Sequence, residues 1–182
     1  MEDEIIPVDE HLVLYSVHER FAGALYGLVK RNQAWLQQSM DWPRHVNSAE
    51  DIRKTLQGNY LLHHRGYAKM FIMYYDDQPA GVISFNQIEP TNKAGWIGYW
   101  LSQELQGQGI MSRALQAFIH HYARSGLVRR FAIKCIVTNQ ASNHVARRNG
   151  FTLEGRLVQA EYLNGAFHDV HLYGRIIDAE DQ

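Results

Sequence analysis

A chain of 182 residues has the length of one ordinary domain. With 46% hydrophobic and 20% charged residues it is too apolar to be disordered, and its longest apolar runs have the length of strands rather than of a membrane span. The formal net charge of −1 excludes a bulk basic field for nucleic acid, although the first half of the chain carries −4 and the second half +3. We therefore expect no nucleic-acid or membrane partner, and we expect any polyanionic ligand to bind the second half.

The first half predicts a strand, two helices, a hairpin and a further strand. Apolar residues at helical spacing predict a helix over Glu19–Gln38. A second helix is expected to begin at Asn47 or Ser48, because an acidic residue three positions later completes a capping box, and to end near Gly66. The strands are expected over these ranges: Leu12–Val17, Ala68–Tyr75, Ala80–Ile88 and Ala94–Leu101.

The second half predicts a helix, a strand, a short helix and a terminal hairpin. The Asn164-Gly165 pair is the strongest short-range hairpin signal in the chain. Gly150 is a suitable residue to end the short helix. The acidic tail, 178–181, is expected to be disordered. The expected elements are Met111–Ala123, Phe131–Val137, Gln140–Asn149 and the hairpin Thr152–Ile177. This order predicts a mixed α/β fold in one continuous domain, 1–182.

The single cysteine, Cys135, excludes an internal disulfide and a cysteine-rich metal site. It stands mid-strand between apolar residues, so we expect a buried thiol. The ten histidines show no metal-binding spacing, and no metal is predicted. The acidic N-terminal residues, 1–4, are not typical of a secretory or organelle targeting segment. These observations favour a cytoplasmic protein.

Gly107 and Gly109 stand between a predicted strand and a predicted helix. Glycine lets the backbone approach a ligand closely, and a helix N-terminus offers unpaired N–H groups, so the loop is suited to phosphate. It is not a P-loop, because Gly-Lys-Ser/Thr is absent, and it is not a dinucleotide fingerprint, because Ser112 stands where that motif needs Gly or Ala. From the loop alone, an ordinary turn before a helix is equally open.

Asn139, Ser142 and Gly150-Phe151 follow that loop further along the chain. The combined pattern resembles the acetyl-CoA-binding core of the GNAT acetyltransferase superfamily, and the order of elements is similar to that fold. Met111 departs from the family pattern, which has Gly or Ala at the last loop position. The resemblance implies a single-domain α/β fold with a mixed, mostly antiparallel sheet flanked by helices, and acetyl-CoA as cosubstrate.

Longer stretches resemble the Rim-type ribosomal-protein N-acetyltransferases, with a core from about residue 5 to 178. They are residues 34–36 with 41–43, 97–101, 107–112, 139–143 and 160–165 with 168–170. Within that branch the chain is most similar to members that acetylate the N-terminal serine of the acidic ribosomal stalk protein. The resemblance therefore implies direct acetyl transfer to the α-amine of a ribosomal protein, and a homodimer.

The resemblance also implies a donor site. The glycine loop would bind pyrophosphate through its amides, the preceding strand would separate from its neighbour and bind the pantetheine arm, and a backbone N–H near Gly98 or Tyr99 would stabilise the oxyanion. The residues implied are Tyr99, Trp100, Leu101, Gln106, Gly107, Gln108, Gly109, Ile110, Met111, Ser112, Asn139 and Asn143. Ser142 is implied as the proton donor to the leaving thiolate, while a capping or first-turn role in the short helix stays open.

Glu161 is the candidate base. Across a two-residue turn at Asn164-Gly165 it faces His168, and a carboxylate beside an imidazole can accept a proton from an amine. A surface charge pair is the alternative. Of the early aromatic residues, Trp35 is expected in the core and Trp42 beside the acceptor. Two other functions stay open: acetylation of a small amine such as a polyamine, amino acid or antibiotic, and a non-catalytic acyl-CoA sensor.

Overall fold

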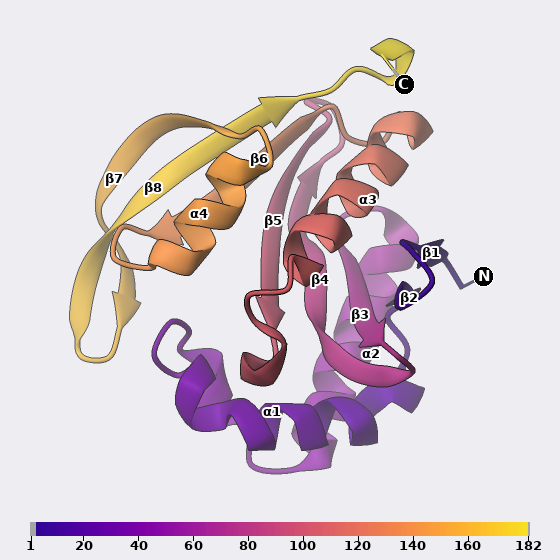
Figure 1. Ribbon diagram of the computed structural model, residues 1–182, viewed down its shortest axis with the longest axis vertical. Coiled ribbons are helices and arrows are strands. Elements are labelled where there is room, and N and C mark those ends of the chain that lie inside the picture. The colour runs from indigo at the N-terminus through magenta and orange to yellow at the C-terminus, as the bar shows by residue number, and fades with distance from the viewer. Residues whose placement is uncertain (1–2, 182) are drawn as a thin grey trace.

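The computed structural model describes residues 3–181, and its centre is an eight-stranded sheet in the order β1-β2-β3-β4-β5-β6-β8-β7 (Figure 1). The strands are β1 (Ile5–Pro7), β2 (Leu12–Ser16), β3 (Lys69–Tyr75), β4 (Gln78–Glu89), β5 (Ala94–Leu101), β6 (Arg130–Ile136), β7 (Thr152–Leu163) and β8 (Ala166–Ile176). The helices are α1 (Ala22–Leu36), α2 (Ala49–Arg65), α3 (Ile110–Ser125) and α4 (Gln140–Arg148), with 3-10 turns at Glu19–Phe21, Trp42–His45, Gln103–Leu105 and Ala179–Asp181.

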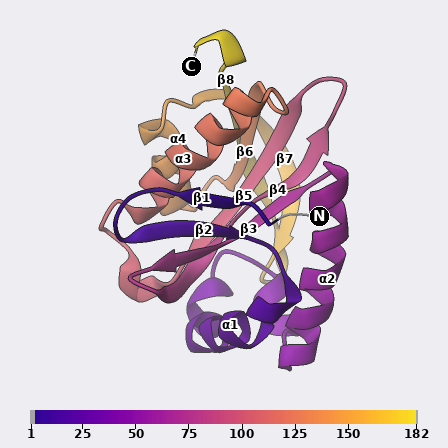
Figure 2. The same ribbon diagram turned by 90° about the vertical axis from the view of Figure 1, so that its right-hand side faces the viewer.

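Helices cover both faces of the sheet (Figures 1 and 2). On one face α3 packs on a large cluster that includes Phe71, Phe85 and Phe118. On the other face α1 and α2 pack on a second cluster that includes Ile72 and Trp100. Successive strand residues point to opposite faces, so neighbours such as Phe71 and Ile72 belong to different cores. The predicted mixed α/β sheet flanked by helices is confirmed.

Local sequence signals predicted most elements correctly. Ser48 caps α2 by accepting a hydrogen bond from the Asp51 N–H at 3.2 Å, and Gly66 ends the helix with a φ of 79°. Asn164 and Gly165 have φ values of 51° and 83° and form the two-residue turn between β7 and β8. Strand β1 was not predicted, because three residues that include a proline give no periodic signal.

The prediction of a disordered acidic tail was wrong for the described residues. The side chain of Arg129 donates a hydrogen bond to the Asp178 carboxylate at 2.8 Å, and Ala179–Asp181 form a 3-10 turn. This ion pair joins residues far apart in the sequence, so composition alone did not reveal it. Across residues 3–181 the structure has no helix long and apolar enough to cross a membrane.

Candidate active site

The site begins where β5 and β6 separate. They are the parallel pair of an otherwise antiparallel sheet, and their register ends at Ile97 with Ile133. Beyond that point β5 continues to Leu101 against β4, while β6 continues to Ile136 against β8. The predicted separation of the strand at residues 99–101 is therefore present. It leaves one edge of β5 available to an extended ligand that pairs with backbone groups.

Three side chains meet across this opening. The Ser142 hydroxyl donates to the Tyr99 phenol oxygen at 3.2 Å, and the phenol in turn donates to the Ser142 carbonyl, also at 3.2 Å. The Cys135 sulfur lies 3.3 Å from the Ser142 hydroxyl oxygen. Burial raises the pKa of the Tyr99 phenol well above its ordinary value, so both oxygens carry protons at neutral pH. The opening thus ends at two protonated hydroxyls, those of Ser142 and Tyr99. The sequence predicted Tyr99 only as a residue that binds the cofactor.

Cys135 is buried as predicted, with 2% of its surface exposed. Burial raises the pKa of its thiol to about 11, and the negative charge of Glu161 contributes in the same direction. The thiol is therefore protonated at neutral pH and is not an activated nucleophile.

The start of α4 holds Ser142 in place. Asn139 is the cap of this helix, and its side-chain oxygen accepts from the Ser142 N–H at 3.2 Å. Asn143 is buried and its amide donates to the carbonyls of Ile136 and Asn139. Its oxygen accepts from the Tyr173 hydroxyl at 2.7 Å. The observed contacts of Asn143 are thus internal and join α4 to β6 and β8, while its predicted contact with the donor stays a prediction.

The loop before α3 has the shape expected of an anion site. Gly107 and Gly109 have φ values of 79° and 72°, in the region that favours glycine. The side-chain amide of Gln106 joins the two ends of the loop by donating to the Leu101 carbonyl at 3.0 Å. The Gln106 N–H still donates to the Gln103 carbonyl, but from Gly107 onward the Arg113 N–H is the first to donate to a backbone carbonyl, that of Gly109, which leaves the backbone amides of residues 107–112 available to a ligand.

The two apolar side chains of this segment point inward. Ile110 and Met111 are 1% and 7% exposed and belong to the core under α3. The family departure at Met111 therefore leaves the outward-facing amides accessible. The Ser112 hydroxyl accepts from the Asn149 amide at 3.0 Å, and Gln108 is exposed. Trp100 lies 9% exposed on the opposite face, so only the backbone of β5 at Trp100 is free to contact a donor.

Glu161 pairs with His168 across the β7–β8 hairpin, as predicted. The imidazole Nε2 lies 3.0 Å from the Leu163 carbonyl and donates to it, rather than to the carboxylate. Glu161 is exposed, so its carboxylate is accessible to water. The register is therefore confirmed, whereas a direct proton relay between the two side chains is not formed.

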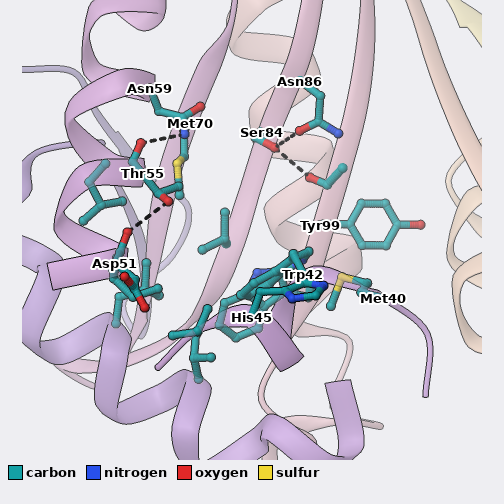
Figure 3. Close-up of a pocket in the computed structure, with 18 residues that line it drawn as sticks. Met40, Trp42, His45, Asp51, Thr55, Asn59, Met70, Ser84, Asn86 and Tyr99 are labelled. Atoms are coloured by element: carbon teal, nitrogen blue, oxygen red, sulfur yellow. Dashed lines mark hydrogen bonds between the residues drawn. The ribbon is translucent and has the colours of Figure 1, made fainter. Parts of the chain in front are cut away.

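A pocket of about 530 Å³ opens on the other side of β5, between the sheet and helices α1 and α2 (Figure 3). The Tyr99 ring projects away from the α2 side of this pocket (Figure 3). At its floor, a Cβ on Gly98 would lie 2.6 Å from the Asn86 amide nitrogen, so a larger residue there would require the Asn86 side chain to move. Trp42 forms part of the wall, with its ring centroid 5.9 Å from that of Trp100. The sequence predicted Trp42 beside the acceptor. It did not predict Asn86 as a pocket residue, because the one sign of it was a polar residue within an apolar strand.

These elements match a known family. Residues 12–152 match the acetyltransferase (GNAT) domain family. The chain belongs to the GNAT acetyltransferases. It is 60% identical over 177 residues to the ribosomal-protein-serine acetyltransferase of Escherichia coli strain K12, covering 97% of this chain and 99% of that protein.

Two solved GNAT structures show the same fold. A RimL ribosomal L7/L12 α-N-protein acetyltransferase, in complex with coenzyme A joined to a cysteine by a disulfide, superposes with a TM-score of 0.95 at 62% identity, over 97% of this chain and 99% of that one. A microcin C7 self-immunity acetyltransferase in complex with acetyl-CoA and AMP superposes with a TM-score of 0.90 at 39% identity, over 93% and 94%.

This GNAT chain is thus an N-acetyltransferase that uses acetyl-CoA. The residues present fit that donor chemically. Outward amides before α3 suit a pyrophosphate, an open strand edge suits the amides of a pantetheine arm, and two hydroxyls end the opening. Among residues 3–181, no group of three or more histidine, cysteine or acidic side chains is arranged to hold a metal ion.

The tip of the β7–β8 hairpin contacts the segment between α1 and α2. The Asn164 amide donates to the Gln37 carbonyl at 3.0 Å, and the Arg44 guanidinium donates to the Asn164 side-chain oxygen. Asn164 thereby connects the hairpin that carries Glu161 to the segment between α1 and α2 that carries Trp42. The candidate base and the pocket wall are held in one arrangement by these contacts.

Proposed function

We propose that this enzyme acetylates the α-amine of an N-terminal serine on a ribosomal protein, the acidic stalk protein. The observation that carries the proposal is the opening in the sheet. A donor edge with two hydroxyls lies on one side of β5, and a pocket that can receive a polypeptide end lies on the other. The near full-length identity of 60% to a ribosomal-protein-serine acetyltransferase supports the choice of acceptor.

In the proposed reaction the acceptor amine attacks the thioester carbonyl directly. The C–N bond forms first and gives a tetrahedral intermediate whose oxygen carries the negative charge. The amine then loses a proton, the C–S bond breaks as the carbonyl re-forms, and the leaving thiolate gains a proton. A backbone N–H at Gly98 or Tyr99 stabilises the oxyanion, and Ser142, supported by Tyr99, protonates the thiolate. Cys135, the only cysteine, lies beside Ser142, which agrees with a thiol end of the donor at this point, since coenzyme A is bound to a cysteine in the RimL structure.

Glu161 takes the amine proton, directly or through water. A lysine amine with a pKa of about 10.4 is only ~0.04% neutral at pH 7, whereas an α-amine with a pKa of about 7.7–8.0 is neutral on the order of 10% of the time. This difference corresponds to roughly 3–4 kcal/mol. A single exposed carboxylate is therefore sufficient for an α-amine acceptor, and much less suited to a lysine side chain.

A small-molecule acceptor is the second candidate, because a relative that is 39% identical binds AMP alongside acetyl-CoA. For a polyamine the pocket carries too little negative charge. Among the residues that the structure describes, Asp51 is the one carboxylate that lines it, and it already accepts a hydrogen bond from the Asn47 N–H at 2.9 Å. The charge of the pocket thus favours a polypeptide end over a polycation.

The remaining parts of the proposal concern the whole protein. We propose a cytoplasmic homodimer in which the chain acts as one GNAT domain, with its core over about residues 5–178. The predicted donor contacts at Asn139, Asn143 and the segment 106–112 belong to the same proposal.

Intact-mass spectrometry tests the acceptor. The enzyme is incubated with acetyl-CoA and either the stalk protein or a panel of polyamines, amino acids and other small amines. The expected result is one added acetyl group on the first residue of the stalk protein, and little product from the amines. Product only in the amine panel would overturn the ribosomal acceptor while keeping the donor.

A variant separates catalysis from binding. Glu161→Gln should lower turnover strongly while acetyl-CoA still binds, because the carboxylate lies outside the donor loop. Equal turnover by the variant and the wild type would contradict the role of Glu161. Bound acetyl-CoA with no acetylated product from any acceptor would favour the sensor instead.

A further inference from the structure

The pocket between the sheet and helices α1 and α2 is much larger than a serine side chain needs. Its volume is about 530 Å³, and it extends from Gly98 on β5 to Leu56 on α2. Most of its wall is apolar, including Val29, Met40, Trp42, Ile52, Met70 and Val82. A pocket of this kind stabilises a ligand mainly by removing apolar surface from water.

The polar side chains of the wall already have partners within the protein. The Thr55 hydroxyl donates to the Asp51 carbonyl at 3.1 Å, and the Asn59 amide donates to the Thr55 carbonyl at 2.9 Å. On the strand side, the Ser84 hydroxyl donates to the Asn86 oxygen at 2.8 Å. These pairs lie around the cavity in Figure 3. These contacts use part of the hydrogen-bonding capacity of the wall, so a charged ligand group would lose more hydration in this mostly apolar pocket than these side chains return.

The pocket is continuous with the reacting edge of β5, because Gly98 and Tyr99 belong to both. In the proposed acceptor the first residue is serine, which holds its amine at this edge and has a small side chain that would not fill the pocket. In an extended chain the next residue lies about 3.3–3.6 Å further on, within reach of the pocket mouth.

We propose that this pocket binds a large apolar side chain at the second position of the acceptor polypeptide. This inference rests on the proposed function, since it assumes an N-terminal α-amine as the acceptor. The preferred residues are leucine, isoleucine, methionine and phenylalanine. The pocket thereby determines which N-termini are acetylated, while the donor site determines the reaction.

Synthetic peptides test this preference. A series shares an N-terminal serine and all other residues, and differs at the second position, which is leucine, alanine or aspartate. We expect kcat/KM to be at least about tenfold higher for leucine than for alanine, mainly through KM, and lowest for aspartate. Equal kcat/KM across peptides that are all acetylated would overturn the pocket assignment and leave the proposed function intact.

A variant that fills the pocket provides the second test. Thr55→Trp places an indole at the wall, and we expect it to reduce the preference for leucine over alanine to about twofold or less. Lys54→Trp is the matched control, because Lys54 is the exposed neighbour on α2 and does not line the pocket. It should retain the full preference. If no peptide is acetylated while acetyl-CoA binds and small amines are turned over, the proposed function fails, and this inference fails with it.

Discussion

Ser142 and Tyr99 form a hydrogen-bonded pair of hydroxyls where β5 and β6 separate, and Ser142 is the proposed proton donor to the leaving thiolate. Proton transfer by a positioned group is worth about 10²–10⁴-fold in rate. We expect Ser142→Ala to lower kcat by about 10²-fold or more. The dissociation constant of acetyl-CoA, measured by calorimetry, should change little, because the donor loop is untouched.

The double variant Ser142→Ala with Tyr99→Phe reports whether the two hydroxyls act as a unit. If they do, the double variant should be scarcely slower than the worse single variant. Cys135→Ala is the matched control, since it changes the packing beside Ser142 without removing a proton donor from the pair. Wild-type kcat in Ser142→Ala would contradict the assignment.

Glu4 provides a residue-scale prediction about stability. Its carboxylate contacts His63 at 2.7 Å, Lys69 at 3.1 Å, Tyr122 at 3.0 Å and His121 at 3.3 Å. Burial alone would raise the pKa of Glu4, but the hydrogen bonds from His121, His63 and Lys69 outweigh burial and hold the pKa far below its ordinary value of 4.5. The charged form is therefore favoured in the folded state.

A lowered pKa stabilises the folded state above the ordinary pKa and loses this contribution as the pH falls toward the folded value. Glu4→Gln should thus lower the free energy of unfolding by about 1–3 kcal/mol at pH 7. The difference between variant and wild type should shrink below about pH 4.5. Urea titrations at pH 7 and pH 3.5 measure both values, and a difference that grows on acidification would contradict the sign.

At the scale of elements, the hairpin β7–β8 and the segment between α1 and α2 meet through one side chain. Asn164→Gly removes the contacts to Gln37 and Arg44 but keeps a residue that tolerates the φ of 51° in the turn. Each of the two lost hydrogen bonds contributes about 0.5–1.5 kcal/mol to holding the hairpin in place. We therefore expect KM for the polypeptide acceptor to rise several-fold or more, with acetyl-CoA binding unchanged.

Arg44→Ala is the companion variant, because it removes one of the same contacts from the other side. Both variants should affect the acceptor in the same direction. A large loss of acetyl-CoA binding in Asn164→Gly would show instead that the hairpin supports the donor site.

Elements bounded by residues that favour a positive φ were predictable from the sequence. Gly66, Gly150 and the Asn164-Gly165 turn carry backbone conformations that few other residues adopt, so the boundaries they set are present in the structure. The Glu161–His168 register followed from the length of that turn. The donor loop was likewise visible as two glycines before a helix.

The pocket and the hydroxyl pair depend on contacts between distant parts of the chain. Ser142 and Tyr99 meet only because β5 and β6 diverge, and no local pattern encodes that divergence. Asn86 lies over Gly98 at an irregularity in the β4–β5 register, which shifts between Phe85 and Gln87. A bulge of this kind moves a side chain from one face to the other, so alternation along the strand misplaces it.

At the scale of the whole molecule, β7 is the last strand of the sheet and exposes a group of large apolar side chains. Val158 is 76% exposed, Phe167 on the paired strand is 64% exposed, and Tyr162 is 54% exposed. The Tyr162 and Phe167 rings contact each other at a centroid distance of 5.3 Å, which gives the surface a continuous aromatic part. Edge strands with such surfaces readily pair with another chain, and a second copy of this chain is the partner that the proposed homodimer requires.

The double variant Val158→Lys with Phe167→Glu should therefore convert a dimer into a monomer in sedimentation equilibrium. Both side chains are exposed in the single chain, so the free energy of unfolding of the monomer should fall by no more than about 1.5 kcal/mol, mainly through loss of the Tyr162–Phe167 ring contact. Leu61→Lys on α2 is the matched control, since Leu61 is also 52% exposed but lies away from this surface. It should leave the dimer intact.

A wild-type protein that sediments as a monomer at micromolar concentration would contradict the homodimer, and a variant that stays dimeric would place the interface elsewhere. Because the hairpin that forms this surface also carries Glu161, comparing kcat in the monomeric variant with wild type separates a dimer that only adds stability from one that positions the base.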